Sequence, residues 1–179
     1  METWEWIVLI AGIAVLVLLV AAFARIRQRR AHLKDRFGRE YERAVSDSGT
    51  GVAEKRLHDA EREREDLSIR PLPSVARDRY LDEWHQLEAR FVSDPREAAH
   101  GAERLVERLL EERGYPEDDD VEHRLALVAV DHPDVAERYR HGRAMVEKDG
   151  AQRTEDLRKA MLDYRAVLED LLQGERTAA

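Results

Sequence analysis

The sequence predicts an all-α fold, in which one N-terminal transmembrane helix is followed by a charged helical stem and a compact antiparallel helical bundle. Three observations lead to this fold class. After residue 25, apolar residues recur at helical spacing, and no stretch alternates as a strand would. The composition is 38% charged and only 6% aromatic, which is typical of amphipathic helices rather than of a sheet. Residues 6–24 carry no charged side chain.

The uncharged stretch is the predicted transmembrane helix. Its 19 residues would extend over about 28 Å, close to the roughly 30 Å of hydrocarbon in a bilayer. Glu2 and Glu5 precede it, whereas the basic segment RIRQRR (residues 25–30) follows it. The positive-inside rule therefore predicts a single-pass protein of the cell inner (plasma) membrane, with its N-terminus outside and its C-terminal domain cytoplasmic.

A cleaved signal peptide is the alternative interpretation of this stretch. Residues 22–24 read A-F-A, which resembles a signal-peptidase site behind an apolar segment. No basic region precedes the apolar segment, however, and four arginines follow directly behind the site. These two features favour a retained helix.

Turn chemistry and proline divide the rest of the chain. Residues 46–51 have the composition of a loop. The prolines at 71 and 73 exclude a helix through residues 69–73 and predict an extended connector. The predicted organisation is a short external tail over 1–5, the transmembrane helix over 6–24, a basic stem and charged helical linker over 25–67, a helical bundle domain over 68–173 and a flexible tail over 174–179.

Within the stem, residues 25–45 are expected to form one helix. Five further helices are expected after the connector, each with an apolar face. Ser74 is the predicted N-cap of the first of them, and Thr154 that of the last. Asp94-Pro95 is a strong start signal for the second, which Gly114 should end. The aromatic residues expected in the core are Tyr80, Trp84, Phe91, Tyr139 and Tyr164.

No residue pattern indicates catalysis, a cofactor or a metal ion, so none is expected. The seven histidines lie at 32, 58, 85, 100, 123, 132 and 141, and none forms an H-E-x-x-H motif. With 0 cysteines, the thiolate zinc signatures are absent as well. The acidic run over 117–120 lacks the spacing of a calcium loop and fits the first turn of a helix over about 118–130.

Charge indicates which partners to expect. The formal net charge is −8, and an acidic domain is repelled by phosphate backbones, so no nucleic acid is expected among the partners. The basic stem instead predicts contact with the lipid bilayer, because each basic residue near the surface contributes about 1 kcal/mol to binding anionic headgroups. Its alternative role is to set topology alone. The candidate headgroup residues are Arg25, Arg27, Arg29, Arg30 and Lys34.

Several short motifs, taken in order, carry a resemblance to a known family. They are LKDRFGREYERAV (residues 33–45), RYLDEW (79–84), ARFVSDP (89–95), RGYP (113–116) and DHP (131–133). Behind a short N-terminal span, this set resembles a family of bacterial single-span membrane proteins of the actinobacterial type, usually described only as uncharacterised, hypothetical, membrane or secreted proteins. The resemblance covers most of the chain from residue 33 to about 170. It implies a bacterial origin and an inner-membrane location, and it implies no activity, cofactor or catalytic residue.

The functional prediction is a membrane-tethered cytoplasmic interaction or scaffold module whose helical domain binds another protein. Two alternatives stay open. One is an enzyme of unrecognised type that uses histidines and carboxylates, and the other is a structural envelope or stress-related protein without a ligand. A pocket lined by convergent histidine and carboxylate groups would favour the enzyme, whereas an exposed apolar face on the bundle would favour the module.

Overall fold

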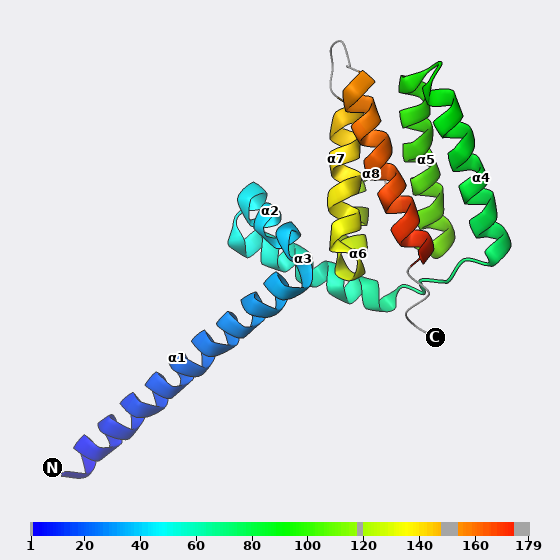
Figure 1. Cartoon of the computed structure of the whole chain (residues 1–179). Coiled ribbons are helices and arrows are strands. Elements are labelled where there is room, and N and C mark those ends of the chain that lie inside the picture. Colours follow the sequence, from blue (N-terminus) through cyan, green and yellow to red (C-terminus); the bar gives the residue numbers. More distant parts are fainter. Residues whose placement is uncertain (1, 118–119, 148–153, 174–179) are drawn as a thin grey trace. The chain divides into compact units, whose positions relative to one another are not determined.

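The computed structural model describes residues 2–117, 120–147 and 154–173. All regular secondary structure within these residues is α-helical, which confirms the all-α prediction (Figure 1). The chain divides into two compact units, residues 1–55 and residues 56–179. The second unit contains the helical bundle.

Helix α1 runs from Glu2 to Phe37. In the part of the chain that the structure describes, no helix combines the length and the apolar character needed to cross a membrane. The side chains of residues 1–15 lie outside the described residues. The finding contradicts the transmembrane helix predicted over residues 6–24. It likewise corrects the predicted single-pass location in the inner membrane with a cytoplasmic C-terminal domain.

The first unit turns at Gly38. This residue has a φ of 51°, a conformation that other residues rarely adopt, and α2 (Arg39–Ser48) begins directly after it. The single helix predicted over residues 25–45 is therefore wrong at this position. Leu33 and Phe37 are buried, as their place on the predicted apolar stripe requires.

The loop predicted over residues 46–51 is reduced to one glycine. Helix α2 continues through Ser48, whose hydroxyl donates to the carbonyl of Ala44 (2.9 Å). Gly49, with a φ of 78°, separates it from α3 (Thr50–Asp66). Serine and aspartate are common in turns, but here their side chains are compatible with the last turn of a helix.

Helix α3 continues into the second unit, where its last turns contact α6 (Val121–Asp131). The carboxylate of Glu63 lies 2.9 Å from Nε2 of His123. The guanidinium of Arg64 donates to Asp131 over 2.6 Å. These two polar contacts join α3 to the bundle.

Residues 67–73 form an extended connector, as the prolines predict. Within it, the N–H of Arg70 donates to the carbonyl of Arg113 (2.8 Å). Helix α4 (Ser74–Phe91) follows. Its N-cap position is the proline before Ser74 and no side chain caps it, so the capping role predicted for this serine is wrong.

The signals predicted for α5 (Pro95–Arg113) are confirmed at both ends. The carboxylate of Asp94 accepts a bond from the N–H of Glu97 (3.1 Å), which satisfies one of the free donors of the first turn. Gly114 ends the helix with a φ of 104°.

The last three helices are α6, α7 (Pro133–Glu147) and α8 (Thr154–Gln173). Asp120 caps α6, since its carboxylate accepts bonds from the N–H groups of Glu122 and His123 (3.0 and 3.2 Å). The predicted start near residue 118 lies outside the described residues. Thr154 is the first residue of α8, and the position before it, where the N-cap of this helix would lie, is also outside them.

Helices α7, α8, α5 and α4 lie side by side in that order (Figure 1). The pairs α4/α5 and α7/α8 run antiparallel, but α5 and α8 run in the same direction (Figure 1). Their C-terminal ends therefore meet, and Nη1 of Arg113 donates to the carbonyl of Leu171 (2.9 Å). The prediction of a wholly antiparallel bundle is wrong for this pair, because the chain reverses twice between the two helices.

The core of the bundle agrees with the predicted apolar faces. Four of the five aromatic residues expected there are buried, and the fifth, Phe91, is half-buried. Arg113 and two other arginines are also buried, each with a hydrogen bond or an ion pair. The buried aromatic residues are Tyr80, Trp84, Tyr139 and Tyr164.

Candidate functional site

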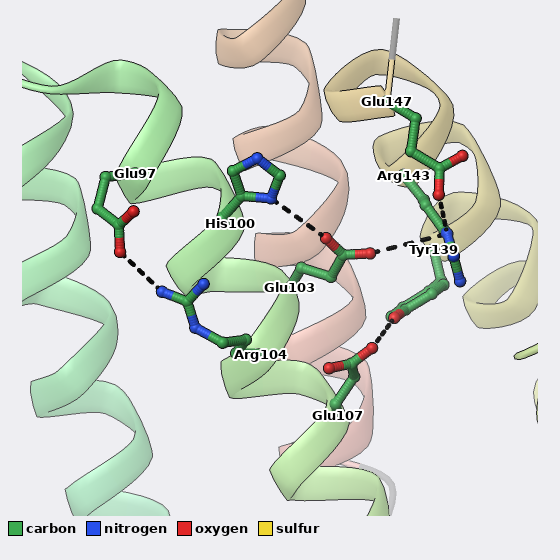
Figure 2. Close-up of polar contacts among 8 residues, drawn as sticks. All are labelled: Glu97, His100, Glu103, Arg104, Glu107, Tyr139, Arg143 and Glu147. Atoms are coloured by element: carbon green, nitrogen blue, oxygen red, sulfur yellow. Dashed lines mark hydrogen bonds and ion pairs between the residues drawn. The ribbon is translucent and has the colours of Figure 1, made fainter. Parts of the chain in front are cut away.

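Two regions of the bundle are candidates for a functional site, and the first is a cluster of charged groups between α5 and α7 (Figure 2). Glu103 and Glu107 are one helical turn apart on α5, so both carboxylates face the same neighbour. From α7, the hydroxyl of Tyr139 donates to Glu107 (2.9 Å). The guanidinium of Arg143 lies 3.9 Å from Glu103 and also donates to Glu147 (2.5 Å).

Burial shifts the protonation equilibria of this cluster. The Glu103 side chain is only 16% exposed, and burial raises its pKa above the usual range. The Glu107 carboxylate raises the pKa of Glu103 further, while Arg143 and His100 act in the opposite direction. Glu103 therefore accepts a proton more readily than an exposed glutamate does.

Helix α8 closes the cluster with a tyrosine. The ring of Tyr164 meets that of Tyr139 edge to face, with centroids 5.7 Å apart and planes at 71°. Its hydroxyl is buried and has no hydrogen-bond partner within the described residues. Burial raises the pKa of both tyrosines, and the nearby glutamates raise it further. Both phenols thus stay protonated at any ordinary pH.

The cluster can hold a proton, but its geometry does not suit metal binding. Among the residues that the structure describes, no group of three or more histidine, aspartate or glutamate side chains is arranged to hold a metal ion. His100 lies on the edge of the cluster, 3.7 Å from Glu103. The arrangement links α5 to α7 and neutralises part of the charge that the fold buries.

The second region is a groove of about 170 Å³ between α4 and α8. These two helices each pack along α5 (Figure 1). The volume is below the roughly 300–1,000 Å³ of typical small-molecule pockets. The groove therefore suits an inserted side chain better than a whole cofactor. Its lining comprises Trp84, Glu88, Phe91, Arg158, Met161, Leu162 and Arg165.

Apolar side chains line the groove, and charged side chains lie along its two edges. Leu162 is 52% exposed, although it is a large aliphatic residue in the middle of a helix. On the α8 side, Arg165 donates to Glu88 across the groove (2.9 Å) and to Glu169 on its own helix (2.8 Å). Arg158 is held by Glu155 one turn earlier (2.8 Å). The α4 edge of the groove thus carries an acid, and each arginine on the α8 edge is paired with a glutamate of the same helix.

The cluster and the groove are separate places. None of the residues that line the groove belongs to the charged cluster. Enzyme active sites usually combine a concave surface with titratable groups of shifted pKa. Here the two features lie on different pairs of helices.

The stem residues proposed to bind lipid headgroups do not converge on one described site. Arg25 and Arg27 are exposed on α1, and the side chains of Arg29 and Arg30 lie outside the described residues. The ammonium of Lys34 lies 3.1 Å from Glu42 of α2. Headgroup binding by this segment stays a prediction.

Within the part of the chain that the structure describes, the histidines do not gather into a metal-binding group either. Five of them lie within 4.0 Å of a carboxylate, each next to a different one, and His85 is exposed beside Trp84. The carboxylates concerned are Glu61, Glu103, Glu63, Asp170 and Asp163.

Neither candidate region was predicted from the sequence, although the sequence contains one unusual feature in each of them. Glu103 and Glu107 are like charges at i and i+4, an unfavourable spacing on a helix unless a neighbouring element compensates it. Leu162 falls outside the inward stripe of α8, next to Met161. This extra apolar residue is the part of the groove lining that the sequence could have indicated. Comparisons of the chain with models of protein families, with curated proteins and with solved structures found no match.

Proposed function

We propose that this chain is a protein-interaction module, and that the groove between α4 and α8 is the surface through which its bundle binds a partner. The observation that carries the proposal is the groove itself, with Leu162 left 52% exposed over an apolar lining. A folded chain gains free energy by burying such a residue, so its exposure in the isolated chain fits a surface that a partner covers.

The separation of the two candidate regions favours binding over catalysis. In the enzyme alternative, a substrate in the groove would need a proton donor or nucleophile beside it. The only ionisable residues that line the groove are Glu88, Arg158 and Arg165, and each is held in an exposed ion pair. The carboxylate with the raised pKa, Glu103, lies in the cluster between α5 and α7 instead.

Photo-crosslinking in living cells tests the proposal. Benzoylphenylalanine placed at position 162 should give a defined crosslinked product, because the probe would sit at the centre of the contact. The matched control is the same probe at Val75, which is 79% exposed on α4 but does not line the groove. The product at 162 should also fade when Arg165→Glu is added. Equal crosslinking from both positions would show that the groove is not a contact surface.

A further inference from the structure

The guanidinium of Arg143 on α7 has partners on two helices. It lies 3.9 Å from Glu103 of α5 and donates to Glu147 of its own last turn over 2.5 Å (Figure 2). We propose that Glu103 is a proton-dependent switch for this contact. The ionised carboxylate holds Arg143, and with it the last turn of α7, against α5. The protonated carboxyl group leaves Arg143 to Glu147 alone, and the last turn of α7 then opens more often.

The two partners of Arg143 differ in their surroundings. The side chain of Glu147 is 58% exposed, so water solvates its charge, whereas that of Glu103 is only 16% exposed. A fall in pH neutralises Glu103 above the usual range of a glutamate, because burial and the neighbouring Glu107 raise its pKa. The contact between the two helices is then lost, and the contact within α7 remains.

The groups around Glu103 confine the change to the last turn of α7. One turn earlier on this helix, the hydroxyl of Tyr139 still donates to Glu107 (2.9 Å), which keeps α5 and α7 joined there. His100 lies 3.7 Å from Glu103, and in its protonated form it also attracts the ionised carboxylate. A protonated Glu103 attracts neither cation. The charged and titratable groups that face Glu103 among the described residues are His100 and Glu107 of α5, Tyr139, Arg143 and Glu147 of α7, and Tyr164 of α8.

Protonation of Glu103 has opposite effects on the whole bundle and on this one contact. For the bundle, protonation removes a buried charge and its repulsion by Glu107, and these two effects outweigh the attraction to Arg143. For the last turn of α7, protonation removes the attraction to Arg143 and replaces it with nothing. A group that only stabilised the fold would change the stability of the bundle and that of the last turn in the same direction. Measuring both therefore separates the two roles.

Hydrogen exchange measured by NMR on the full chain tests the switch. The amides of residues 144–147 report on the last turn of α7, because local opening exposes them without unfolding of the bundle. Protection factors correct for the direct effect of pH on exchange chemistry, so they can be compared across pH. As the pH is lowered from neutral toward the usual pKa of a glutamate, these factors should fall severalfold, because Glu103 takes up its proton above that value.

Three variants assign the effect to this contact. Glu103→Gln mimics the protonated carboxyl group, so at neutral pH it should lower the protection of residues 144–147 severalfold while it raises the free energy of unfolding of the bundle. Arg143→Gln removes the guanidinium and should give low protection that no longer depends on pH. Glu97→Gln is the matched control on α5, because Glu97 pairs with Arg104 at the surface, and it should behave as the unchanged chain does.

The outcomes separate the switch from a general effect on stability. Protection of residues 144–147 that stays constant with pH would overturn the switch, and so would an unchanged pH response in Arg143→Gln. If Glu103→Gln lowers this protection and the stability of the bundle together, the glutamine has loosened the bundle as a whole, and the switch is overturned as well. A fall confined to the last turn of α7, with the stability of the bundle raised, would establish Glu103 as the group that controls this contact.

Discussion

Gly142 of α7 leaves the space that the ring of Tyr164 from α8 fills. A Cβ atom added at residue 142 would lie 3.2 Å from Cζ of Tyr164, closer than ordinary van der Waals contact. The tyrosine cannot readily move away, because it is fully buried and its ring meets that of Tyr139. The close approach of α7 and α8 at this point therefore depends on glycine.

We expect Gly142→Ala to destabilise the bundle by about 1 kcal/mol. Alanine favours a helix over glycine by about 1 kcal/mol, but overpacking a rigid site costs about 1–3 kcal/mol. Denaturant unfolding followed by circular dichroism measures the difference. Gly101→Ala on α5 is the matched control, because there the new methyl group meets only the end of the Leu87 side chain, which can change rotamer. A stabilising effect of Gly142→Ala would show that Tyr164 is free to shift.

Glu103 should make the bundle more stable in acid than at neutral pH. Its pKa is raised in the folded chain, chiefly by burial, so the folded state favours the protonated form. This contribution is fully present below the unfolded pKa and is lost as the pH rises through the folded pKa. Each unit of the shift corresponds to about 1.4 kcal/mol. We expect Glu103→Gln to flatten the pH dependence of unfolding between the two pKa values and to stabilise the chain at pH 7.

The control for this change is Glu97→Gln on the same helix, since the Glu97 side chain is 42% exposed and pairs with Arg104 at the surface. It should leave the pH profile close to that of the unchanged chain. If Glu103→Gln also leaves the profile unchanged, the Glu103 carboxylate is solvated and the cluster contributes no linkage between protonation and folding.

Local signals in the sequence were correct at both ends of α5, although the same kind of signal was wrong at Ser74. Asp94 and Gly114 were correctly predicted to begin and end α5, because a side-chain cap and a positive φ are properties of single residues. The turn at Gly38 was missed, although its glycine was visible. Leu33 and Phe37, just before the glycine, belong to an apolar stripe at helical spacing. The prediction followed this stripe and therefore continued the helix through Gly38.

The arrangement of non-consecutive helices could not be predicted in the same way. The groove exists because α4 and α8 share α5 as a neighbour, and nothing in either segment specifies that they do so. For the same reason Glu103 could not be singled out among 38 acidic residues. Its raised pKa arises from the packing of α7 and α8 over α5. The predicted span over residues 6–24 rested on the length of the segment and on its lack of charged side chains, and the described residues contain no helix of the required length and apolar character.

Gly114 should tolerate substitution less well than any glycine inside a helix. Its φ of 104° disfavours every L residue, and a Cβ atom there would lie 2.7 Å from the carbonyl oxygen of Ser68 in the connector. We expect Gly114→Ala to cost about 2–4 kcal/mol, from backbone strain and displacement of the connector together. Thermal unfolding measures this loss. Gly51→Ala, where no atom lies within 4 Å, should instead be neutral or slightly stabilising. Similar effects of Gly114→Ala and Gly51→Ala would mean that the connector does not restrict the space for a side chain at residue 114.

Trp84 is a core residue that also lines the groove. Two substitutions of this residue separate the contribution of packing to stability from that of hydrogen bonding. The side chain is only 3% exposed, so Trp84→Ala should destabilise the bundle by about 3–5 kcal/mol. Its indole N–H is buried without a hydrogen-bond partner within the described residues, so Trp84→Phe removes an unsatisfied donor while it keeps most of the apolar volume. We therefore expect Trp84→Phe to cost clearly less than Trp84→Ala.

Val75→Ala provides the baseline for both changes, because Val75 is 79% exposed on the same helix and its truncation should stay within about 0.5 kcal/mol. Chemical unfolding followed by far-ultraviolet circular dichroism suits all three variants, since it does not depend on the fluorescence of the residue that is changed. An effect of Trp84→Ala as small as that of Val75→Ala would place Trp84 outside the core. Equal losses for Trp84→Phe and Trp84→Ala would show that a ring at this position contributes little by packing, because both changes remove the indole N–H and only Trp84→Phe keeps a ring.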